Sequence, residues 1–536
     1  MAILPPGVSE KNFTQAIQRF ERIVGDEWVF TSDEDVRLYR DAYSPLWHEE
    51  DEKLASAAVA PVSAEQVQAV VRAASELGIP LYTISTGRNL GYGGSAPVLS
   101  GSVVLDLKRM NKILSVDERN ANALVEPGVN YFDLYRHIRD NGMKLWIDCP
   151  DPGWGSVMGN ALDHGAGYTM NPYRDHFRAH CGMEVVLGDG ELVRTGMGAL
   201  PGSQTWQQFS YGYGPYLDGI FSQSNFGVVT KMGIWLLPEP EAYLEGIVNA
   251  QRHDDIIPLV DIMSYLMNSG IQNAGTNLQS PLRFAAASHP DVQELLTRAD
   301  EDAKQALNRF AAENKIPFWS NVLKFYGPEE VVRAQWNYAK QRFASAIPDV
   351  ELRDGPFYRF PLSDDQIKGV RDESNFGIPS LSIFSIGARS PTNPTPTDGH
   401  LWFSPVIPMT GEAVLESQRV LTATLRELGH KVSVNVFPQS YHPRTFLVLI
   451  GFPIMHDVEA NRSVRASFRR LIQVAAQHGW AEYRTHTAFM DDCARVYSFN
   501  DHALLRLHER IKDAVDPNGI LSAGRYGIWP KHLRQA

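Results

Sequence analysis

Apolar positions recur at helical spacing in two segments of the first 80 residues. In residues 9–24 they fall every three or four positions, which predicts an amphipathic helix. A second helix is predicted after Ser63-Ala64-Glu65-Gln66, a capping sequence in which the serine and the glutamine can each satisfy a backbone N–H group, and Gly78 is placed to end it. The apolar run 81–84 then predicts a strand.

Between residues 100 and 240, short apolar runs alternate with glycine and proline, a pattern typical of strands joined by turns. Two prolines in Leu236-Leu237-Pro238-Glu239-Pro240 follow the last of these runs and mark a domain boundary. The predicted strands are 102–107, 122–126, 183–187 and 228–236, and a helix is predicted at 131–141.

Beyond residue 240 the pattern changes to long amphipathic helices with short apolar runs between them. This mixture predicts a second unit of the α+β class. The predicted helices are 254–267, 291–313, 328–345, 411–429 and 457–478, and the strand candidates are 400–406, 431–437 and 445–451.

Composition places the chain among globular proteins and narrows its partners. Its 536 residues are 43% apolar and 21% charged, which suffices for two or three domains with substantial cores. The net charge is −12 and no basic patch stands out, so neither nucleic acid nor an anionic membrane is an expected partner. There is no secretory leader and no apolar run of transmembrane length, which favours a cytoplasmic location.

The cysteines agree with that location. Cys149, Cys181 and Cys493 lie far apart and show no C-x-x-C spacing, so the sequence indicates neither a zinc site nor a disulfide framework, and we expect no metal. Reduced thiols are typical of a reducing cytoplasm.

A glycine-rich stretch follows the predicted strand 81–84. Residues 83–97 contain four glycines among serine and threonine hydroxyls, and clustered backbone N–H groups of this kind bind phosphate oxygens. Gly91-Tyr92-Gly93-Gly94-Ser95-Ala96 matches G-x-G-x-x-G/A, but the dinucleotide-binding fingerprint also requires a helix directly after it. Pro97 and another strand follow instead, so we reject a Rossmann fold. Taken alone, the stretch fits a glycine-rich hairpin better.

Further motifs follow this stretch in order along the chain. They are Ser85-Thr86-Gly87-Arg88-Asn89, Glu126-Pro127-Gly128-Val129, Gly153-Trp154-Gly155-Ser156-Val157-Met158-Gly159-Asn160, Arg194-Thr195-Gly196-Met197-Gly198-Ala199-Leu200-Pro201, Gln223-Ser224-Asn225-Phe226-Gly227-Val228-Val229-Thr230-Lys231 and Asp516-Pro517-Asn518-Gly519-Ile520. As a set they resemble the vanillyl-alcohol oxidase / p-cresol methylhydroxylase flavoprotein family, most closely its 4-alkylphenol oxidases. The resemblance covers nearly the whole chain and is weakest at 241–400.

This resemblance implies a two-domain α+β fold of the p-cresol methylhydroxylase (PCMH) type. An FAD-binding domain spans 1–240, and an α+β cap domain that binds substrate spans 241–482. The family motifs resume after the cap, so we expect residues 483–536 to return to the FAD-binding domain. Dimers are common in the family, and a homodimer is the expected assembly.

The resemblance also assigns residues to FAD. His400, in Gly399-His400-Leu401-Trp402-Phe403-Ser404-Pro405, matches the histidine that is bonded to the flavin 8α-methyl group, and a neutral imidazole suits nucleophilic attack on an electrophilic flavin. Without the resemblance, a lone histidine beside an apolar strand is more often structural. The other FAD-binding residues implied are Ser85, Thr86, Gly87, Arg88, Asn89, Gly91, Gly93, Gly94, Gly155, Ser156, Gly159, Asn160, Gly227, Val228, Val229 and Arg525.

Three residues are implied to hold the substrate as a phenolate: Tyr92, Tyr483 and Arg484. Two phenol donors and a permanently charged guanidinium favour an ionised oxygen. Asp151 matches the family's acid beside flavin N5, although an aspartate before Pro-Gly is by default a turn residue, and Asp148 competes for the role.

The rest of the substrate pocket is assigned less specifically. Tyr168 is a further catalytic candidate near the ring, in a loop that is two residues longer than in relatives. Ser404, Asn435 and Trp402 are expected to line the pocket near the substrate tail.

The implied function is FAD-dependent oxidation of para-substituted phenols, such as 4-ethylphenol, eugenol or vanillyl-alcohol-like compounds. A benzylic hydride leaves for flavin N5, the substrate becomes a p-quinone methide, and water addition or proton loss gives an alcohol or a vinylphenol. The partners are then a small phenol and O2, which yields H2O2. Two alternatives stay open: a dehydrogenase that passes electrons to a cytochrome, and a flavin-binding protein without turnover.

Overall fold

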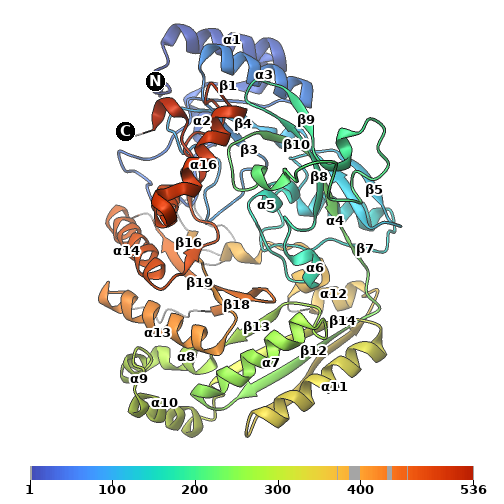
Figure 1. Cartoon of the computed structure of the whole chain (residues 1–536), viewed down its shortest axis with the longest axis vertical. Coiled ribbons are helices and arrows are strands. Elements are labelled where there is room, and N and C mark those ends of the chain that lie inside the picture. Colours follow the sequence, from blue (N-terminus) through green and yellow to red (C-terminus); the bar gives the residue numbers. More distant parts are fainter. Residues whose placement is uncertain (1–2, 371, 386–398, 431–436, 456, 535–536) are drawn as a thin grey trace.

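The computed structural model describes residues 3–370, 372–385, 399–430, 437–455 and 457–534. Both ends of the chain lie in the upper half of the molecule in Figure 1, and the middle of the chain forms the lower half. Three larger sheets organise these halves, two in the upper half and one in the lower. A fourth sheet has two strands, β7 (Leu145–Trp146) and β11 (Leu237–Pro238). The architecture confirms the predicted α+β fold with two packed parts.

The first sheet carries the glycine-rich stretch. Strands β2, β4 and β3 run parallel, and β1 adds antiparallel to β2. Helices α1 and α3 pack against each other, and α3 begins where the Ser63 hydroxyl accepts a hydrogen bond from Gln66 N–H and ends at Gly78 in the left-handed region. The predicted helices and strand are confirmed here. The bounds are α1 Glu10–Val24, β1 Val29–Phe30, β2 Ala57–Val59, α3 Ala64–Leu77, β3 Leu81–Ile84 and β4 Val103–Asp106.

The second sheet is antiparallel and has five strands in the order β5-β6-β10-β8-β9. All seven residues of β8 are buried, including the polar His180 and Glu184. Helix α4 begins with a capping box between Asn130 and Asp133. The bounds are β5 Ile113–Asp117, β6 Asn122–Val125, α4 Tyr131–Asp140, β8 His180–Val186, β9 Leu192–Arg194 and β10 Val228–Trp235.

The third sheet forms the cap, with the strand order β15-β12-β14-β13-β18-β19-β17-β20 and β16 paired to β19. Helix α11 packs on β12 and β14, α7 packs on α11 and α13, and α14 packs on α13 (Figure 1). The bounds are β12 Ala242–Ala250, α7 Ile256–Asn268, β13 Thr276–Gln279, β14 Trp319–Gly327, α11 Glu329–Ala346, β15 Glu351–Arg359, β16 Gly399–Phe403, β17 Pro405–Pro408, α13 Gly411–Glu427, β18 Phe437–His442, β19 Thr445–Ile454, α14 Val458–Gln477 and β20 Ala481–Glu482.

Two predictions in this part need correction. The helix predicted at 291–313 is two helices, α9 (Pro290–Leu295) and α10 (Glu301–Glu313), because Asp300 caps the second one by accepting a hydrogen bond from Ala303 N–H. The strand predicted at 400–406 is interrupted at Ser404 and becomes β16 and β17. Most of the strand candidate 431–437 lies outside the described residues.

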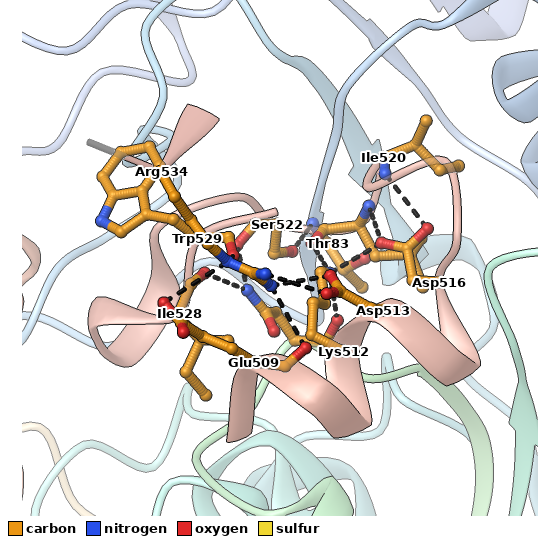
Figure 2. Close-up of polar contacts among 12 residues, drawn as sticks. Thr83, Glu509, Lys512, Asp513, Asp516, Ile520, Ser522, Ile528, Trp529 and Arg534 are labelled. Atoms are coloured by element: carbon orange, nitrogen blue, oxygen red, sulfur yellow. Dashed lines mark hydrogen bonds and ion pairs between the residues drawn. The ribbon is translucent and has the colours of Figure 1, made fainter. Parts of the chain in front are cut away.

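The C-terminal segment lies beside β3, the strand that leads into the glycine-rich stretch. Leu81 accepts a hydrogen bond from Ser522 N–H and donates one to the Ile520 carbonyl. The Ser522 hydroxyl accepts from Thr83 N–H (Figure 2). Beneath this contact, a fully buried Lys512 Nζ lies 2.7 Å from Asp516 and donates to the carbonyls of Asn225 and Leu521. Burial lowers the pKa of Lys512, while Asp516 opposes that shift.

Arg534 adds a second attachment in the same segment, with an ion pair to Asp513 and a hydrogen bond to the Trp529 carbonyl (Figure 2). The glycine-rich stretch therefore rests on residues more than 400 positions later in the chain. In the segments that the structure describes, no helix combines the length and apolar character needed to cross a membrane.

Candidate active site

A cavity of about 150 Å³ lies at the end of β3. The glycine-rich stretch, the start of helix α5 (Val157–Leu162), the residues before and within β10, and the C-terminal segment form its wall. Fourteen of the predicted FAD-binding residues line it: Ser85, Thr86, Gly87, Arg88, Asn89, Gly93, Gly94, Gly155, Ser156, Gly159, Asn160, Gly227, Val229 and Arg525. Gly91, Val228 and His400 do not line this cavity.

The wall of this cavity depends on the close approach of helix α5 to the glycine-rich stretch. Ser156 caps α5 by accepting a hydrogen bond from Gly159 N–H, and its hydroxyl donates to the Pro127 carbonyl 2.6 Å away. A Cβ atom at Gly159 would collide with the Ser85 hydroxyl, so the helix and the glycine-rich stretch can meet only because this position is glycine. The result is a cradle rich in backbone groups and small hydroxyls, which suits an anionic phosphate group.

A second cavity of about 300 Å³ adjoins the first. Asn89, Pro150, Pro152 and Asn160 line both cavities and form their common wall. Seven of the predicted substrate-site and flavin-linking residues line the second cavity, namely Tyr92, Asp151, Tyr168, His400, Trp402, Tyr483 and Arg484. They come from segments up to 392 positions apart, between Tyr92 and Arg484.

Arg484 lies against two tyrosine rings at one end of the second cavity. Its guanidinium carbon is 3.9 Å from the Tyr92 ring centre and 5.3 Å from that of Tyr483. Burial lowers the pKa of Arg484, but the charges of Tyr483, Tyr92 and Asp163 outweigh burial and raise it, so the side chain stays cationic. Among the described residues, its buried Nε and Nη1 have no hydrogen-bond partner. Buried donors of this kind normally bind a partner, and here they line a cavity.

The residues before and after Arg484 hold it in place. Glu482 accepts a hydrogen bond from Ser404 N–H at 2.9 Å, and burial raises the pKa of this carboxyl well above its usual value. His486 lies 2.6 Å from Asp41, which ties the segment to the N-terminal part. Ser404 does not line the cavity, but its hydroxyl lies 3.4 Å from the Tyr92 hydroxyl.

Asp151 and Tyr168 form a pair on the wall of the second cavity. The Tyr168 hydroxyl donates to Asp151 Oδ2 at 2.6 Å. Burial raises the pKa of Asp151, and Tyr168 and the charge of Arg484 act in the opposite direction. The competing Asp148 lines neither cavity; it accepts from Thr169 N–H and lies 2.8 Å from His176 Nε2. Geometry therefore favours Asp151 as the carboxylate exposed to a ligand.

His400 sits on β16, buried, with its ring 5.0 Å from Trp402 and 5.2 Å from Tyr43. Gly91 has a φ of +88°, and a Cβ there would lie 3.2 Å from the imidazole Cδ2, so the glycine-rich stretch packs directly on this histidine. His400 also lines the second cavity. Asn435 lies outside the described residues.

Sequence analysis missed several residues of the site. Asp163 accepts from Asn89 at 2.6 Å and lies 3.7 Å from Arg484 and 3.9 Å from Arg525, so it links the two cavities. Arg174 and the apolar Ile383, Leu447 and Leu449 line the second cavity. In the sequence, the one feature that pointed to Arg174 is the extra length of the loop that contains it.

These features fit FAD. The first cavity offers a phosphate cradle, it shares a wall with the second cavity, and His400 lines the second cavity. No cluster of His, Cys, Asp and Glu suited to a metal ion occurs in the part of the chain that the structure describes.

Comparisons with known proteins agree with this site. Residues 55–196 match the family model of the FAD binding domain, and residues 444–526 match that of the C-terminal domain of FAD linked oxidases. The chain is 34% identical over 531 residues to the 4-cresol dehydrogenase [hydroxylating] flavoprotein subunit of Pseudomonas putida, which covers 98% of each protein.

Two solved structures are similar over nearly their whole length. The 4-ethylphenol oxidase of Gulosibacter chungangensis, in complex with isoeugenol, has a TM-score of 0.82 and 35% identity, covering 99% of this chain and 100% of that one. p-Cresol methylhydroxylase with substrate bound has a TM-score of 0.81 and 32% identity, covering 98% and 99%.

Proposed function

Since the chain belongs to the vanillyl-alcohol oxidase / p-cresol methylhydroxylase family and is an FAD-linked oxidoreductase of its phenol-oxidising group, we propose that it oxidises para-substituted phenols at the benzylic carbon and passes the electrons to O2. FAD, when bound, supplies the two-electron acceptor. The chain's own residues bind the phenol, orient it and manage its protons.

The observation that carries this proposal is the end of the second cavity at Arg484. A phenolate oxygen there would accept hydrogen bonds from the buried Nε and Nη1 donors, and the Tyr92 and Tyr483 hydroxyls would complete the contact. Charge-assisted hydrogen bonds are short and strong, so the site favours the ionised phenol. Ionisation in turn pushes electron density through the ring toward the para substituent, whose benzylic carbon loses the hydride.

Asp151 is assigned to the other end of the reacting unit. As a carboxylate it stabilises the positive charge that develops near the benzylic carbon and accepts the proton of an arriving water. Tyr168 orients it through the 2.6 Å hydrogen bond. His400 is assigned to a covalent bond with FAD, because it lines the cavity that adjoins the phosphate cradle and packs on Gly91 of the glycine-rich stretch.

Anaerobic mixing of the purified holoenzyme with 4-ethylphenol tests the proposal. The flavin absorbance near its long-wavelength maximum should bleach, and admission of air should restore it with formation of H2O2. 4-Ethylanisole, in which the phenol is methylated, is the matched control and should leave the flavin oxidised. Equal bleaching by both compounds would overturn phenolate binding.

A second candidate is a dehydrogenase that uses a cytochrome, because the 34% identical relative is a dehydrogenase flavoprotein subunit. In that case the reduced flavin would persist in air and be reoxidised rapidly by a cytochrome c or by a dye. The rate of reoxidation by air therefore separates the two electron acceptors. A flavin-binding protein without turnover would not bleach with any phenol.

A further inference from the structure

Arg174 is a second arginine on the wall of the 300 Å³ cavity, and the proposed reaction makes no use of it. It ends the short helix α6 (Asn171–Arg174), and its side chain is 3% exposed. A guanidinium stays charged inside proteins, so Arg174 brings a positive charge to the wall of this cavity.

The position of Arg174 is fixed from two sides. Its Nε–H donates to the Gly167 carbonyl at 3.0 Å, and Gly167 N–H donates back to the Arg174 carbonyl at 3.0 Å, which closes the loop next to Tyr168. On the cap side, Gly275 lies against the guanidinium, and a Cβ there would collide with its Cζ. The chain therefore builds a rigid location for one positive charge.

The neighbourhood of Arg174 carries further positive charge. Lys324 on β14 is 2% exposed, and burial first and Arg174 second lower its pKa to about 8. Its Nζ donates to Asn375 at 2.6 Å. Burial also lowers the pKa of His442, Asp175 opposes that shift, and Arg174 adds to it.

Of the carboxylates in this neighbourhood, Asp148, Glu245 and Asp175 contact protein groups. Asp148, Glu245 and Asp372 are the acids whose charges raise the pKa of Lys324. Asp148 is bound by Thr169 and His176, and Glu245 accepts from the Tyr243 hydroxyl. Asp175 lies 3.6 Å from His442.

The two arginines of the second cavity act on different neighbours. The charge of Arg484 interacts with Tyr92, Tyr483 and Asp163. That of Arg174 interacts with Lys324, Tyr326 and His442, all of them in the cap. The Asp151–Tyr168 pair joins the two neighbourhoods, since Arg484 acts on Asp151 and Tyr168 follows Gly167, the residue that anchors Arg174.

We propose that Arg174 binds a carboxylate at the end of the para side chain, so that the preferred substrates are 4-hydroxyphenylalkanoates rather than neutral alkylphenols. The inference rests on the proposed function and specifies its substrate class. The phenolate is held at Arg484, the carboxylate at Arg174, and the benzylic carbon lies between them near Asp151. The redox step is unchanged: the benzylic C–H bond breaks, its hydride reduces bound FAD, and the carboxylate keeps all its atoms.

The first test compares 3-(4-hydroxyphenyl)propanoate with its primary amide, which has the same size and no charge. Anaerobic flavin reduction in the wild-type holoenzyme should have a second-order rate constant about ten- to a hundredfold higher for the acid, the usual range for a hydrogen bond to a charged group. Arg174→Gln should remove that preference, measured as the ratio of the rate constants for acid and amide in the same variant, so that a common change in both constants does not affect the result. Arg178→Gln, an exposed arginine four residues later, is the matched control and should keep the preference.

Binding gives a readout that does not depend on turnover. 4-Hydroxycinnamate and its amide lack a benzylic C–H bond at saturated carbon, so they should perturb the flavin spectrum without reducing it. The acid should bind more tightly than the amide to the wild type, and Arg174→Gln should equalise the two. If Arg174→Gln lacks flavin, the test uses Arg174→Lys together with the comparison of acid and amide in the wild type.

Equal constants for acid and amide in the wild type would overturn the inference, as would an equal loss for both in Arg174→Gln. Failure of the proposed function looks different, because then 4-ethylphenol and both propanoate derivatives leave the flavin oxidised. In that event the binding titration still decides whether Arg174 recognises a carboxylate.

Discussion

The two adjoining cavities are built in different ways. The 150 Å³ cavity is formed largely by backbone and small side chains from the glycine-rich stretch, the start of α5 and the C-terminal segment. The 300 Å³ cavity is formed by large polar and apolar side chains from both halves of the molecule, including Arg484, Asp151 and Leu449. The first cavity is therefore suited to a single ligand of fixed shape. In the second cavity, substitution of a single side chain can change which ligand is bound. Substitutions in the first should therefore alter flavin retention, and those in the second should alter substrate choice and rate.

His400 lines the second cavity and packs on the glycine-rich stretch, and its substitution has the largest expected effect. His400→Ala should abolish the covalent flavin bond entirely while the cradle still binds FAD. Acid-treated gels of denatured wild type should show a fluorescent protein band that the variant lacks. Trp402→Phe, which changes the ring packed beside the imidazole, is the control and should keep the band. Release of all flavin from denatured wild type would contradict the assignment.

Asp151 tests the chemistry of the second cavity. Asp151→Asn should lower the rate constant of flavin reduction by 4-ethylphenol by about two to four powers of ten, as loss of a general base does. Inhibitor affinity should change far less, because the phenolate is held at Arg484. Asp148→Asn is the contrasting variant, since Asp148 binds Thr169 and His176 and lines neither cavity. It should lower stability and leave the reduction rate of flavin-replete protein near that of the wild type.

The pH dependence of that rate gives a further check on Asp151. Its pKa is raised by burial, and the carboxyl must be ionised to act as a base. The rate should therefore fall on acidification at a higher pH than an ordinary aspartate would give, and Asp151→Asn should lose this inflection. Stopped-flow reduction across the pH range measures it. An inflection at the ordinary carboxyl value would contradict the role of burial.

Substitution of Lys512 tests the segment that supports the first cavity. Lys512→Met leaves Asp516 buried without its cation, and breaking a buried pair in this way costs about 3–5 kcal/mol of unfolding free energy. Because the same segment holds β3, the variant should also lose FAD while the substrate preference of the remaining holoenzyme is unchanged (Figure 2). Lys531→Met, at an exposed position, should match the wild type in both measurements. Thermal unfolding and flavin content are measured together.

The residues of the first cavity are easier to predict from the sequence than those of the second. Those of the first cavity lie in short continuous motifs, so local spacing carries most of the information, as with Gly155, Ser156 and Gly159. The second cavity depends on contacts that only folding creates. Arg174 reaches its place because Met170 pairs with Ala274 and because Gly275 leaves room for the guanidinium, and no local pattern encodes either contact.

Strands β14 and β15 could not be predicted from the sequence for a similar physical reason. β14 is buried on both faces, so it lacks the alternation of apolar and polar residues that marks a strand covered on one side. β15 lies at the sheet edge and is largely solvent-exposed, which gives it a polar sequence. The resemblance to a family supplied the class of fold, but the strand order of the cap came from the structure.

Arg484 tests binding in the second cavity. Arg484→Gln should weaken phenolic inhibitors by about ten- to a hundredfold, the range expected when a hydrogen bond to a charged group is lost. Arg484→Lys keeps the charge but not the planar pair of donors, so it should recover part of the affinity. Flavin content should stay close to that of the wild type in both variants, which distinguishes this cavity from its neighbour. Loss of flavin with unchanged inhibitor affinity would contradict the division between the cavities.

Ser404 gives the smallest effect and the finest test of how the phenolate end is held. Its N–H donates to Glu482, a backbone contact that Ser404→Ala retains, so the substitution removes only the hydroxyl 3.4 Å from the Tyr92 hydroxyl. A neutral hydrogen bond contributes about 0.5–1.5 kcal/mol, so inhibitor affinity should fall by about two- to tenfold. Ser417→Ala removes an equally buried hydroxyl that donates to Val414 in α13, and it should leave affinity unchanged. If Ser404 acts by orienting Tyr92, then Ser404→Ala should add nothing in a Tyr92→Phe background, because coupled residues are not additive. A full additional loss in that background would mean that Ser404 contacts the ligand directly.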